Sequence, residues 1–382
     1  ETIMGTKLIV IALVLLVLLL TGGNDYLNTV VPYSNPLYYD NRASLGIAEE
    51  DVMKIDDTVG FNPAMGPLKD IYDRGDMAII HGVGFENSTR SHFRAMDIWH
   101  TAEPDKVSMK GRLGQTVRDL DPEGENPVTA VNVGQGLPRA MVAPGVSVAS
   151  VADLSTYGLL TGVEEQQLRE KMLDRFANMY TPAIGSGPVM DYLAQTGLDA
   201  LKGADMLKDA PLSYESSIEY GNTPLAGKLR DIAKIHTANL GTRVLYAEHG
   251  VYDTHAAQGP NHPKLWSDVA GAVNDFWADL KEHDSDQNVV MFIFTEFGRR
   301  VKENGTGTDH GAGGVAFALG PNVEGGQYND YPSLAPEDLR EGDLAPNHDF
   351  RGVYSTLIED WFGLDAKPIV EGTFEKPDLI HK

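Results

Sequence analysis

Short apolar runs alternate with longer amphipathic segments along most of this chain. Runs with few polar residues predict buried strands, because a parallel strand that is covered on both faces has no polar side. We expect such strands at Met77–Val83, Val128–Val133, Val244–Ala247, Val289–Phe294 and Gly314–Leu319. Their spacing leaves room for helices between successive strands.

Apolar residues that recur every three or four positions predict the helices of this fold. We expect them at Ser91–Trp99, Gly162–Tyr180, Leu193–Leu207, Leu225–Leu240, Pro263–Leu280 and Val353–Phe362. Pro263 suits the first turn of its helix. The alternation predicts an α/β fold with a central, mostly parallel sheet. We expect residues 1–382 to form one domain, with a helical, cap-like insertion at about 155–240.

The longest apolar run, Leu8–Leu20, has thirteen residues and admits three interpretations. It is shorter than the roughly 20 residues that a membrane-spanning helix needs, so we expect no stable membrane span. A signal-peptide core is a second interpretation, but no Ala-x-Ala cleavage site follows the run. We favour a central strand, because Gly22-Gly23-Asn24-Asp25 follows directly and is typical of the turn at the end of an active-site strand.

Composition narrows the class of protein. The chain has 382 residues, 42% of them hydrophobic, which is enough for a large core. Its formal net charge is −24 without a long basic run, so we expect no nucleic-acid partner. The absence of cysteine excludes disulfides, thiolate ligands and a cysteine nucleophile. A homo-oligomer is compatible with the sequence, which does not determine the oligomeric state.

Carboxylate and imidazole side chains follow several of the predicted strands. Asp25 follows the first strand, Asp253 and His255 follow Val244–Ala247, and Glu296 follows Val289–Phe294. The carboxyl ends of parallel strands meet at one edge of a sheet, where ligands bind. His310 precedes the strand Gly314–Leu319, so we expect a loop to carry it back to that edge.

These residue types are those that bind hard or borderline divalent cations, such as zinc, magnesium, manganese or calcium. Each residue also has an ordinary structural interpretation. Asp25 and Ser91 could cap helices, Glu296 could pair with Arg299 or Arg300, and the histidines could be hydrogen-bonded core residues. Taken together, the five residues Asp25, Asp253, His255, Glu296 and His310 predict a metal site with one or two ions.

Several longer motifs resemble a known family. They are GGNDYLNTVVPY, STRSHF, YDTHAAQ, FTEFGRRVKENGTGTDHG and DFRGVYSTLIEDWFG. The chain resembles, over about residues 21–363, an uncharacterised family of exported bacterial proteins in the alkaline phosphatase and sulfatase superfamily. The resemblance implies an alkaline phosphatase-like three-layer α/β sandwich and a periplasmic or extracellular location.

The resemblance also implies roles for individual residues. It assigns Asp253, His255 and His310 to a first metal site, and Asp25 and Glu296 to a second. The second site would also include Ser91, which matches the superfamily's nucleophile; Thr89 is the alternative nucleophile.

One departure concerns the residue after Glu296. The superfamily has a histidine there, whereas this chain has Phe297. A second site without imidazole would favour magnesium, calcium or manganese over zinc, or only one ion would bind.

Further polar residues surround this set. We expect Arg90, Arg94 and Arg299 to grip a phosphate or sulfate group. Asn24 and Asp309 would orient the ligands. His262 could be a second contact of this kind, a substrate contact or a turn residue.

Two functions follow from this pattern. The first is a metal-dependent hydrolase of phosphate or related esters, with a serine nucleophile and a small anionic ester as substrate. The resemblance disfavours sulfate esters, because this chain has no cysteine to supply a sulfatase nucleophile and Ser91 lacks the nearby proline of the serine sulfatase signature. The alternative is a secreted, non-catalytic metal-binding or structural protein on the same fold.

Overall fold

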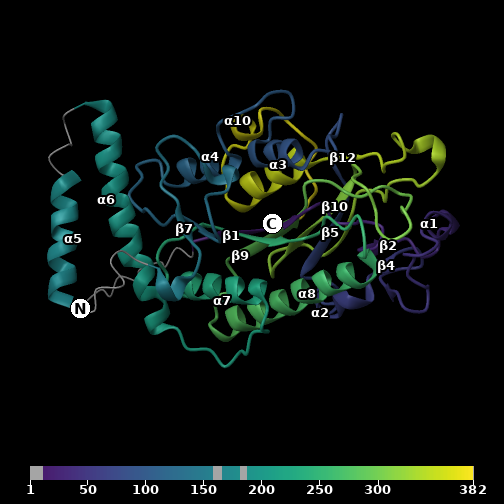
Figure 1. The fold of residues 1–382 in the computed structure, drawn as a ribbon, viewed down its shortest axis with the longest axis horizontal. Helices are drawn as coiled ribbons and strands as arrows, with labels where there is room; N and C mark the ends of the chain where they lie inside the picture. The colour runs from purple at the N-terminus through teal and green to yellow at the C-terminus, as the bar shows by residue number, and fades with distance from the viewer. Residues whose placement is uncertain (1–11, 158–165, 181–186, 382) are drawn as a thin grey trace, which may run out of the picture.

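The computed structural model describes residues 12–157, 166–180 and 187–381, and a nine-stranded sheet lies at the centre of this part of the chain (Figure 1). The strand order is β11-β5-β10-β9-β1-β8-β6-β7, and β12 also pairs with β5. The strands are β1 (Val14–Thr21), β5 (Met77–Gly84), β6 (Ala130–Val133), β7 (Ala149–Val151), β8 (Val244–Gly250), β9 (Val289–Phe294), β10 (Gly314–Leu319), β11 (Gly326–Tyr328) and β12 (His348–Asp349). Among these nine strands, only β10 is antiparallel to its neighbours, β5 and β9. The fold is therefore α/β with a mostly parallel sheet, as predicted.

The long apolar run supplies the central strand. β1 lies between β8 and β9 and is parallel to both, with Leu15 opposite Val244 and Val290. Its residues from 14 to 20 are buried, because helices cover both faces of the sheet. The prediction of a central strand is confirmed for this part of the run, whereas residues 8–11 lie outside the described residues. Among the described helices, none has the length and apolar character needed to cross a membrane.

Helices form a layer on each face of the sheet. Leu16 and Leu18 of β1 face a core that includes α2 (Gly66–Asp73), α7 (Pro224–Thr237) and α8 (Gln258–Glu282). Alternate β1 residues face the opposite core. The helices on that side are α3 (His92–Thr101), α4 (Arg112–Leu120), α9 (Phe350–Ser355) and α10 (Lys367–Val370). The two helical layers are visible above and below the sheet in Figure 1.

The predicted insertion at 155–240 divides into two parts. α5 (Gln166–Tyr180) and α6 (Pro188–Asp209) extend away from the sheet at one side of the molecule (Figure 1). By contrast, α7 packs beside α8 in the helical layer. The predicted start of the first of these helices, at residues 162–165, lies outside the described residues.

Two predicted helices differ in their bounds. α8 begins five residues before Pro263, which lies inside the helix. The first turn forms because it is anchored by other segments: the Gln258 N–H donates to the Thr306 carbonyl at 3.0 Å. At the end of the chain, α9 continues into a π-helical segment, Thr356–Trp361.

A small second sheet lies near the end of β1. Its strands are β2 (Val30–Val31), β4 (Gly60–Phe61) and β3 (Met53–Lys54), in that order, and α1 (Pro36–Asn41) lies between β2 and β3 in the chain. Arg42 follows α1 directly and is 1% exposed. This small sheet and α1 therefore place the buried, positively charged side chain of Arg42 beside the segment that follows β1.

Candidate metal centre

The strand directions bring the candidate ligands to one edge of the sheet. β1, β5, β8 and β9 all end at this edge, because they share one direction. β10 runs the opposite way, so it begins where the others end. His310 precedes β10 by four residues and therefore reaches the site directly. Our expectation that a loop must carry His310 back assumed a parallel β10 and is corrected by this topology.

A close approach of two segments fixes the Asp253 loop. A Cβ atom on Gly22 would lie 2.5 Å from the Asp253 nitrogen, so only glycine allows this contact. Arg299 is 1% exposed and donates to the carbonyls of Gly22, Gly23, Tyr252 and Thr308. Its guanidinium thus ties the loops that follow β1, β8 and β9 into one frame around the site.

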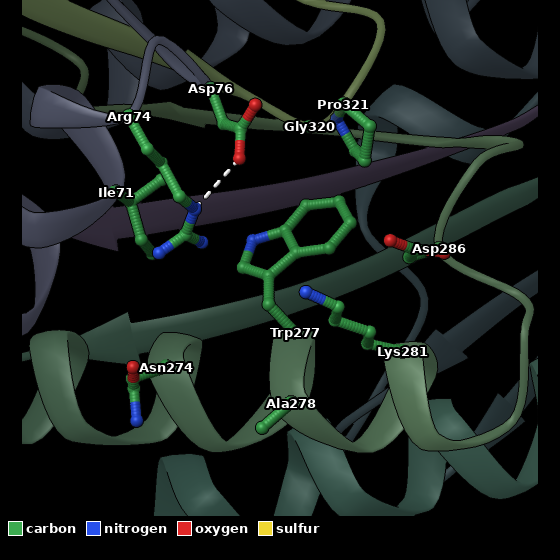
Figure 2. Close-up of a pocket in the computed structure, with 10 residues that line it drawn as sticks. All are labelled: Ile71, Arg74, Asp76, Asn274, Trp277, Ala278, Lys281, Asp286, Gly320 and Pro321. Atoms are coloured by element: carbon green, nitrogen blue, oxygen red, sulfur yellow. Dashed lines mark hydrogen bonds and ion pairs between the residues drawn. The ribbon is translucent and has the colours of Figure 1, made fainter.

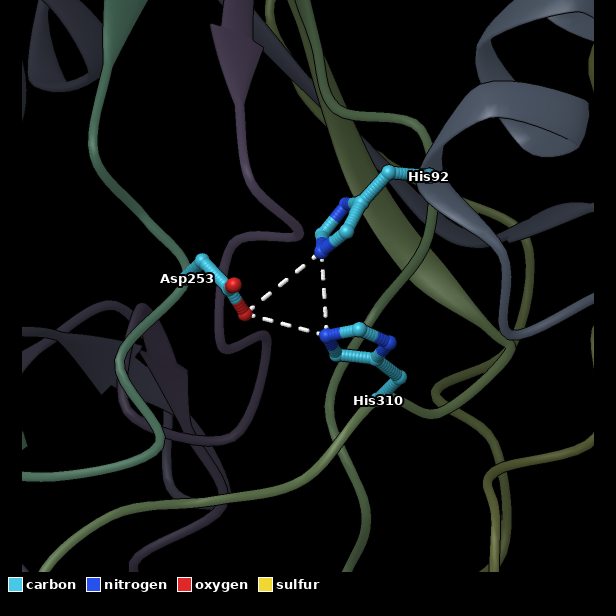
Figure 3. Close-up of side chains that lie close together, drawn as sticks. All are labelled: His92, Asp253 and His310. Atoms are coloured by element: carbon cyan, nitrogen blue, oxygen red, sulfur yellow. Dashed lines mark hydrogen bonds and ion pairs between the residues drawn. The ribbon is translucent and has the colours of Figure 1, made fainter.

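Ligand atoms from three loops converge within this frame. Figure 3 shows His92, Asp253 and His310 pointing toward one another, and their ligand atoms lie within 4.8 Å of one another. His310 Nε2 is 3.0 Å from both His92 Nε2 and Asp253 Oδ1, and the last two atoms are 3.5 Å apart. Two ligand atoms of a tetrahedral zinc ion stand about 3.3 Å apart, so this spacing fits a zinc-sized cation.

His255 extends the same group. Its Nε2 atom lies 2.9 Å from His310 Nε2 and 3.1 Å from Asp253 Oδ1. The side chain of His255 is more exposed than that of His310, at 44% against 21%. Three imidazoles and one carboxylate therefore contribute donor atoms to one small volume.

The outer nitrogen of each imidazole has an acceptor that fixes its proton. Nδ1 of His310 lies 2.7 Å from the Arg90 carbonyl oxygen, which can only accept. Nδ1 of His92 lies 2.8 Å from Glu296 Oε1, and Nδ1 of His255 lies 3.0 Å from Asp309 Oδ1. In the neutral tautomer that these contacts select, every Nδ1 carries the hydrogen and every Nε2 presents a lone pair to the cluster. This arrangement is typical of histidines that bind a metal.

The charges around the cluster also favour a cation. Asp253, Glu296 and Asp309 contribute three carboxylates, against the guanidinium of Arg299. Burial raises the pKa of Asp253, but the hydrogen bond from Arg299 and its positive charge outweigh burial and hold the pKa at about 2. The hydrogen bond from His255 lowers the pKa of Asp309. Both groups are therefore anionic at neutral pH.

Asp25 lies outside this cluster. It is fully buried, with Arg42 Nη2 2.9 Å from its Oδ1 atom and Arg42 Nη1 2.5 Å from its Oδ2 atom, and Gln258 also donates to Oδ2. Burial raises the pKa of Asp25, but the charge of Arg42 and its hydrogen bonds lower it further. The guanidinium of Arg42 thus compensates the charge of Asp25.

Asn24 and His262 form a neighbouring buried group. The Asn24 side-chain oxygen lies 3.0 Å from His262 Nε2 and 3.1 Å from Trp266 Nε1. Burial lowers the pKa of His262 to about 4. These contacts link the end of β1 to α8 and do not reach the ligand atoms.

Glu296 and Phe297 both contact His92, although in different ways. Glu296 is 2% exposed and accepts from His92 Nδ1 and from the Gly22 N–H at 2.9 Å. It orients an imidazole in this structure, and its carboxylate does not join the converging atoms. The ring of Phe297 packs on His92 and His310, with centroids 4.8 and 5.0 Å away.

Ser91 and Thr89 immediately precede His92. Ser91 is the exposed N-cap of α3, but its side chain makes no capping hydrogen bond. Thr89 Oγ1 accepts from the Ser91 N–H at 3.2 Å. The Ser91 hydroxyl is thus adjacent in sequence to a candidate ligand and is not committed to the helix.

The three candidate arginines are engaged by other protein groups. Arg90 pairs with Asp343 at 2.8 Å, and Arg94 pairs with Asp97 at 2.7 Å. Arg299 donates to main-chain carbonyls and to Asp253, as described above. None of these guanidinium groups is directed to an open anion site by its described contacts.

His92 is the candidate ligand that sequence reasoning missed. The STRSHF motif pointed to its serine as the chemical residue, whereas the structure brings its histidine to the cluster. The position of His92 could have indicated this role, because it follows a buried strand and is the first residue of a helix. Asp309 was expected to be an orienting residue, and the structure places it against His255.

A small cavity at the opposite edge of the sheet is unrelated to this site. Figure 2 shows Trp277 at its centre, beside the Arg74–Asp76 ion pair, with Asp286 across the opening. Its volume is about 220 Å³. Asp76 and Asp286 precede β5 and β9, so this cavity lies at the ends where those strands begin.

Residues 202–369 match the model of a family described as "Protein of unknown function (DUF1501)". No curated protein matches the chain.

Similar solved structures include sulfatases and a member of the alkaline phosphatase superfamily. The PsFucS1 sulfatase from Pseudoalteromonas sp. is 12% identical with a TM-score of 0.44, covering 96% of this chain and 71% of that chain. An alkaline phosphatase superfamily protein from Vibrio parahaemolyticus is 11% identical with a TM-score of 0.38, covering 96% and 70%. The periplasmic domain of EcEptC from Escherichia coli, solved with zinc, is 11% identical with a TM-score of 0.38, covering 96% and 88%.

Proposed function

We propose that this protein is a metal-dependent hydrolase of phosphate or related esters, with one divalent cation held by His92, Asp253, His255 and His310. The observation that carries the proposal is the convergence of three Nε2 lone pairs and a carboxylate oxygen. No proton lies between these atoms in the neutral tautomers, so they would repel one another without a cation. A bound cation would act as a Lewis acid toward an ester oxygen.

A single zinc-like ion fits the site better than two ions. Three imidazoles and one carboxylate are ligands typical of zinc, whereas magnesium and calcium prefer oxygen ligands alone. A second ion would need the position beside Asp25 that the Arg42 guanidinium occupies, and both side chains are fully buried. We therefore assign Glu296 and Asp309 the role of orienting His92 and His255.

Ser91 is the proposed nucleophile, with Thr89 as the alternative. The Ser91 oxygen would form a bond to phosphorus while the bond from phosphorus to the ester oxygen breaks. The alcohol would leave with the proton that the serine gives up, and water would then cleave the phosphoserine. The N–H groups at the start of α3 would stabilise the anionic substrate, because a helix N-terminus carries partial positive charge. They would take this role in place of Arg90 and Arg94, which are already paired with carboxylates.

The direct test is hydrolysis of 4-nitrophenyl phosphate by zinc-loaded and metal-free protein. We expect turnover only with metal, and Ser91→Ala should abolish it while one ion remains bound. If Thr89→Ala rather than Ser91→Ala abolishes turnover, Thr89 is the nucleophile. Ser88→Ala is the matched control and should keep turnover, because the Ser88 hydroxyl is already committed to the Phe85 carbonyl, to which it donates at 2.8 Å.

A second function is favoured by the same donor set. Four protein ligands can close the coordination of zinc, as they do in structural sites. In that case the protein would bind metal for stability or surface assembly and hydrolyse no ester. Turnover by the wild type excludes this alternative, whereas full metal binding without turnover in a broad ester screen supports it. Export to the periplasm or beyond remains part of both proposals, and cell fractionation tests it.

A further inference from the structure

We propose that a cavity beside Asp253 binds the alcohol portion of the substrate and selects esters of apolar alcohols. The inference rests on the proposed function, because it requires the anionic group to lie at the metal centre. The cavity has a volume of about 600 Å³, which suits a small organic group. Asp253 belongs both to the cavity wall and to the metal cluster, so a ligand could extend from one to the other.

The wall next to Asp253 is suited to an apolar group. Leu225, Val251 and Leu265 contribute aliphatic groups to the wall, and Lys228 of α7 and Glu248 of β8 also line the cavity. Lys228 Nζ donates to the Glu248 carbonyl at 2.6 Å, so its charge is partly satisfied within the protein. An apolar ring would gain from the removal of its own surface and of the exposed Val251 side chain from water.

Val251 provides an independent observation. Its φ angle is 101°, a conformation that is strongly unfavourable for a β-branched residue. The conformation is held by its neighbours, because the Tyr252 N–H donates to the Thr21 carbonyl at 3.0 Å and Arg299 donates to the Tyr252 carbonyl at 2.9 Å. Strain of this kind clusters at functional sites.

The strained side chain gains little from the protein itself. Val251 is 77% exposed, so packing within the chain does not compensate the backbone strain. Glycine would adopt the same φ freely. We therefore infer that the exposed Val251 side chain contacts a bound ligand in the cavity that it helps to line.

Two non-hydrolysable probes test this inference without relying on turnover. Phenylphosphonate and methylphosphonate carry the same anionic group and differ in the apolar part. We expect zinc-loaded wild type to bind phenylphosphonate at least about tenfold more tightly by calorimetry, as burial of an aromatic ring implies. Phenylphosphonate, but not methylphosphonate, should shift the Val251 methyl resonances in NMR spectra.

The variant Val251→Gly should lower this preference at least about threefold, because part of the apolar wall is lost. Its melting temperature should stay equal or rise, because the strain is relieved. Asp284→Gly is the matched control: it relieves a positive φ of 50° beyond α8, near the start of β9. This control should leave the preference unchanged.

The outcomes separate the two proposals. If methylphosphonate binds and phenylphosphonate binds no better, or if the Val251 methyl resonances do not respond, the cavity assignment is wrong while the metal centre stands. An unchanged preference in folded Val251→Gly also overturns the role of Val251. If neither phosphonate binds the zinc-loaded protein, the proposed anion site fails, and this inference fails with it.

Discussion

At the scale of residues, the metal centre depends on the partners that fix each imidazole. Glu296 accepts from His92 Nδ1 and from the Gly22 N–H, and it is almost fully buried. The carboxylate therefore sets both the tautomer and the orientation of His92. Removing its charge should weaken metal binding although Glu296 is not one of the proposed ligands.

We expect Glu296→Gln to lower zinc affinity about 10- to 100-fold, as changes of such partners do in other zinc sites. Competition with a chromophoric chelator measures this. Glu303→Gln is a suitable control, because Glu303 also accepts from main-chain N–H groups, those of Ser44 and Leu45, but does not contact a ligand. Equal zinc affinity in wild type and Glu296→Gln would show that Glu296 does not orient His92.

The sequence predicted which residues belong to the site better than it predicted the partners that these residues contact. Asp253, His255 and His310 were grouped from their positions near strand ends, and the structure brings them together. Asp25 has the same kind of position, but its partner is Arg42, which belongs to a segment whose placement no local pattern reveals. His92 was not predicted as a ligand, because the serine next to it in the STRSHF motif was interpreted as the chemical residue. The spacing of the motif does not distinguish these two adjacent side chains.

At the scale of elements, the hairpin-like segment between β9 and β10 shapes the site. Arg299 and His310 form an isolated antiparallel bridge within it. Gly307 lies against the Asp253–His255 loop, and a Cβ atom there would stand 2.3 Å from the His255 carbonyl carbon. The added Cβ atom would clash with main-chain atoms of Thr254 and His255, which cannot move aside as a flexible side chain could.

Gly307→Ala should therefore displace His255 and lower zinc affinity at least about tenfold, since a binding site must be held to within about 0.5 Å. Zinc titration followed by calorimetry measures the effect. Gly271→Ala is the control: it lies in α8 with no atom within 4 Å of the added Cβ, and should raise stability by about 0.5–1 kcal/mol. Unchanged zinc affinity in Gly307→Ala would contradict the packing of these two loops.

The apolar runs predicted the main strands because burial on both faces leaves a strong sequence pattern. Strand direction has no such pattern, so the antiparallel β10 was not predicted. The bounds of α8 were missed for a related reason, because a contact between Gln258 and the distant Thr306 fixes its first turn.

At the scale of the whole molecule, several buried histidines make stability depend on pH. Burial lowers the pKa of His81 to about 4, that of His262 to about 4 and that of His100 to about 3. An unfolded chain binds these protons near pH 6.5. The unfolded state therefore takes up more protons below that pH, and the folded state loses stability as the pH falls from about 6.5 to about 4.

We expect the free energy of unfolding to fall by several kcal/mol across this range, with about 3 kcal/mol from His81 alone. Urea denaturation of the metal-free protein at a series of pH values measures it. His81→Gln should flatten the dependence, although it also changes the contacts with Tyr26 and Gln327. A free energy that stays constant between pH 6.5 and 4 would contradict the neutral, buried state of these histidines.

The central claim is that one metal ion is bound at the edge of the sheet by His92, Asp253, His255 and His310. The most direct measurement is zinc titration of metal-free wild type and of His92→Ala, with elemental analysis of the bound metal. We predict one zinc ion per wild-type chain and a loss of tight binding in a folded His92→Ala protein. Full zinc binding by His92→Ala, or no zinc bound by the wild type, would contradict the account.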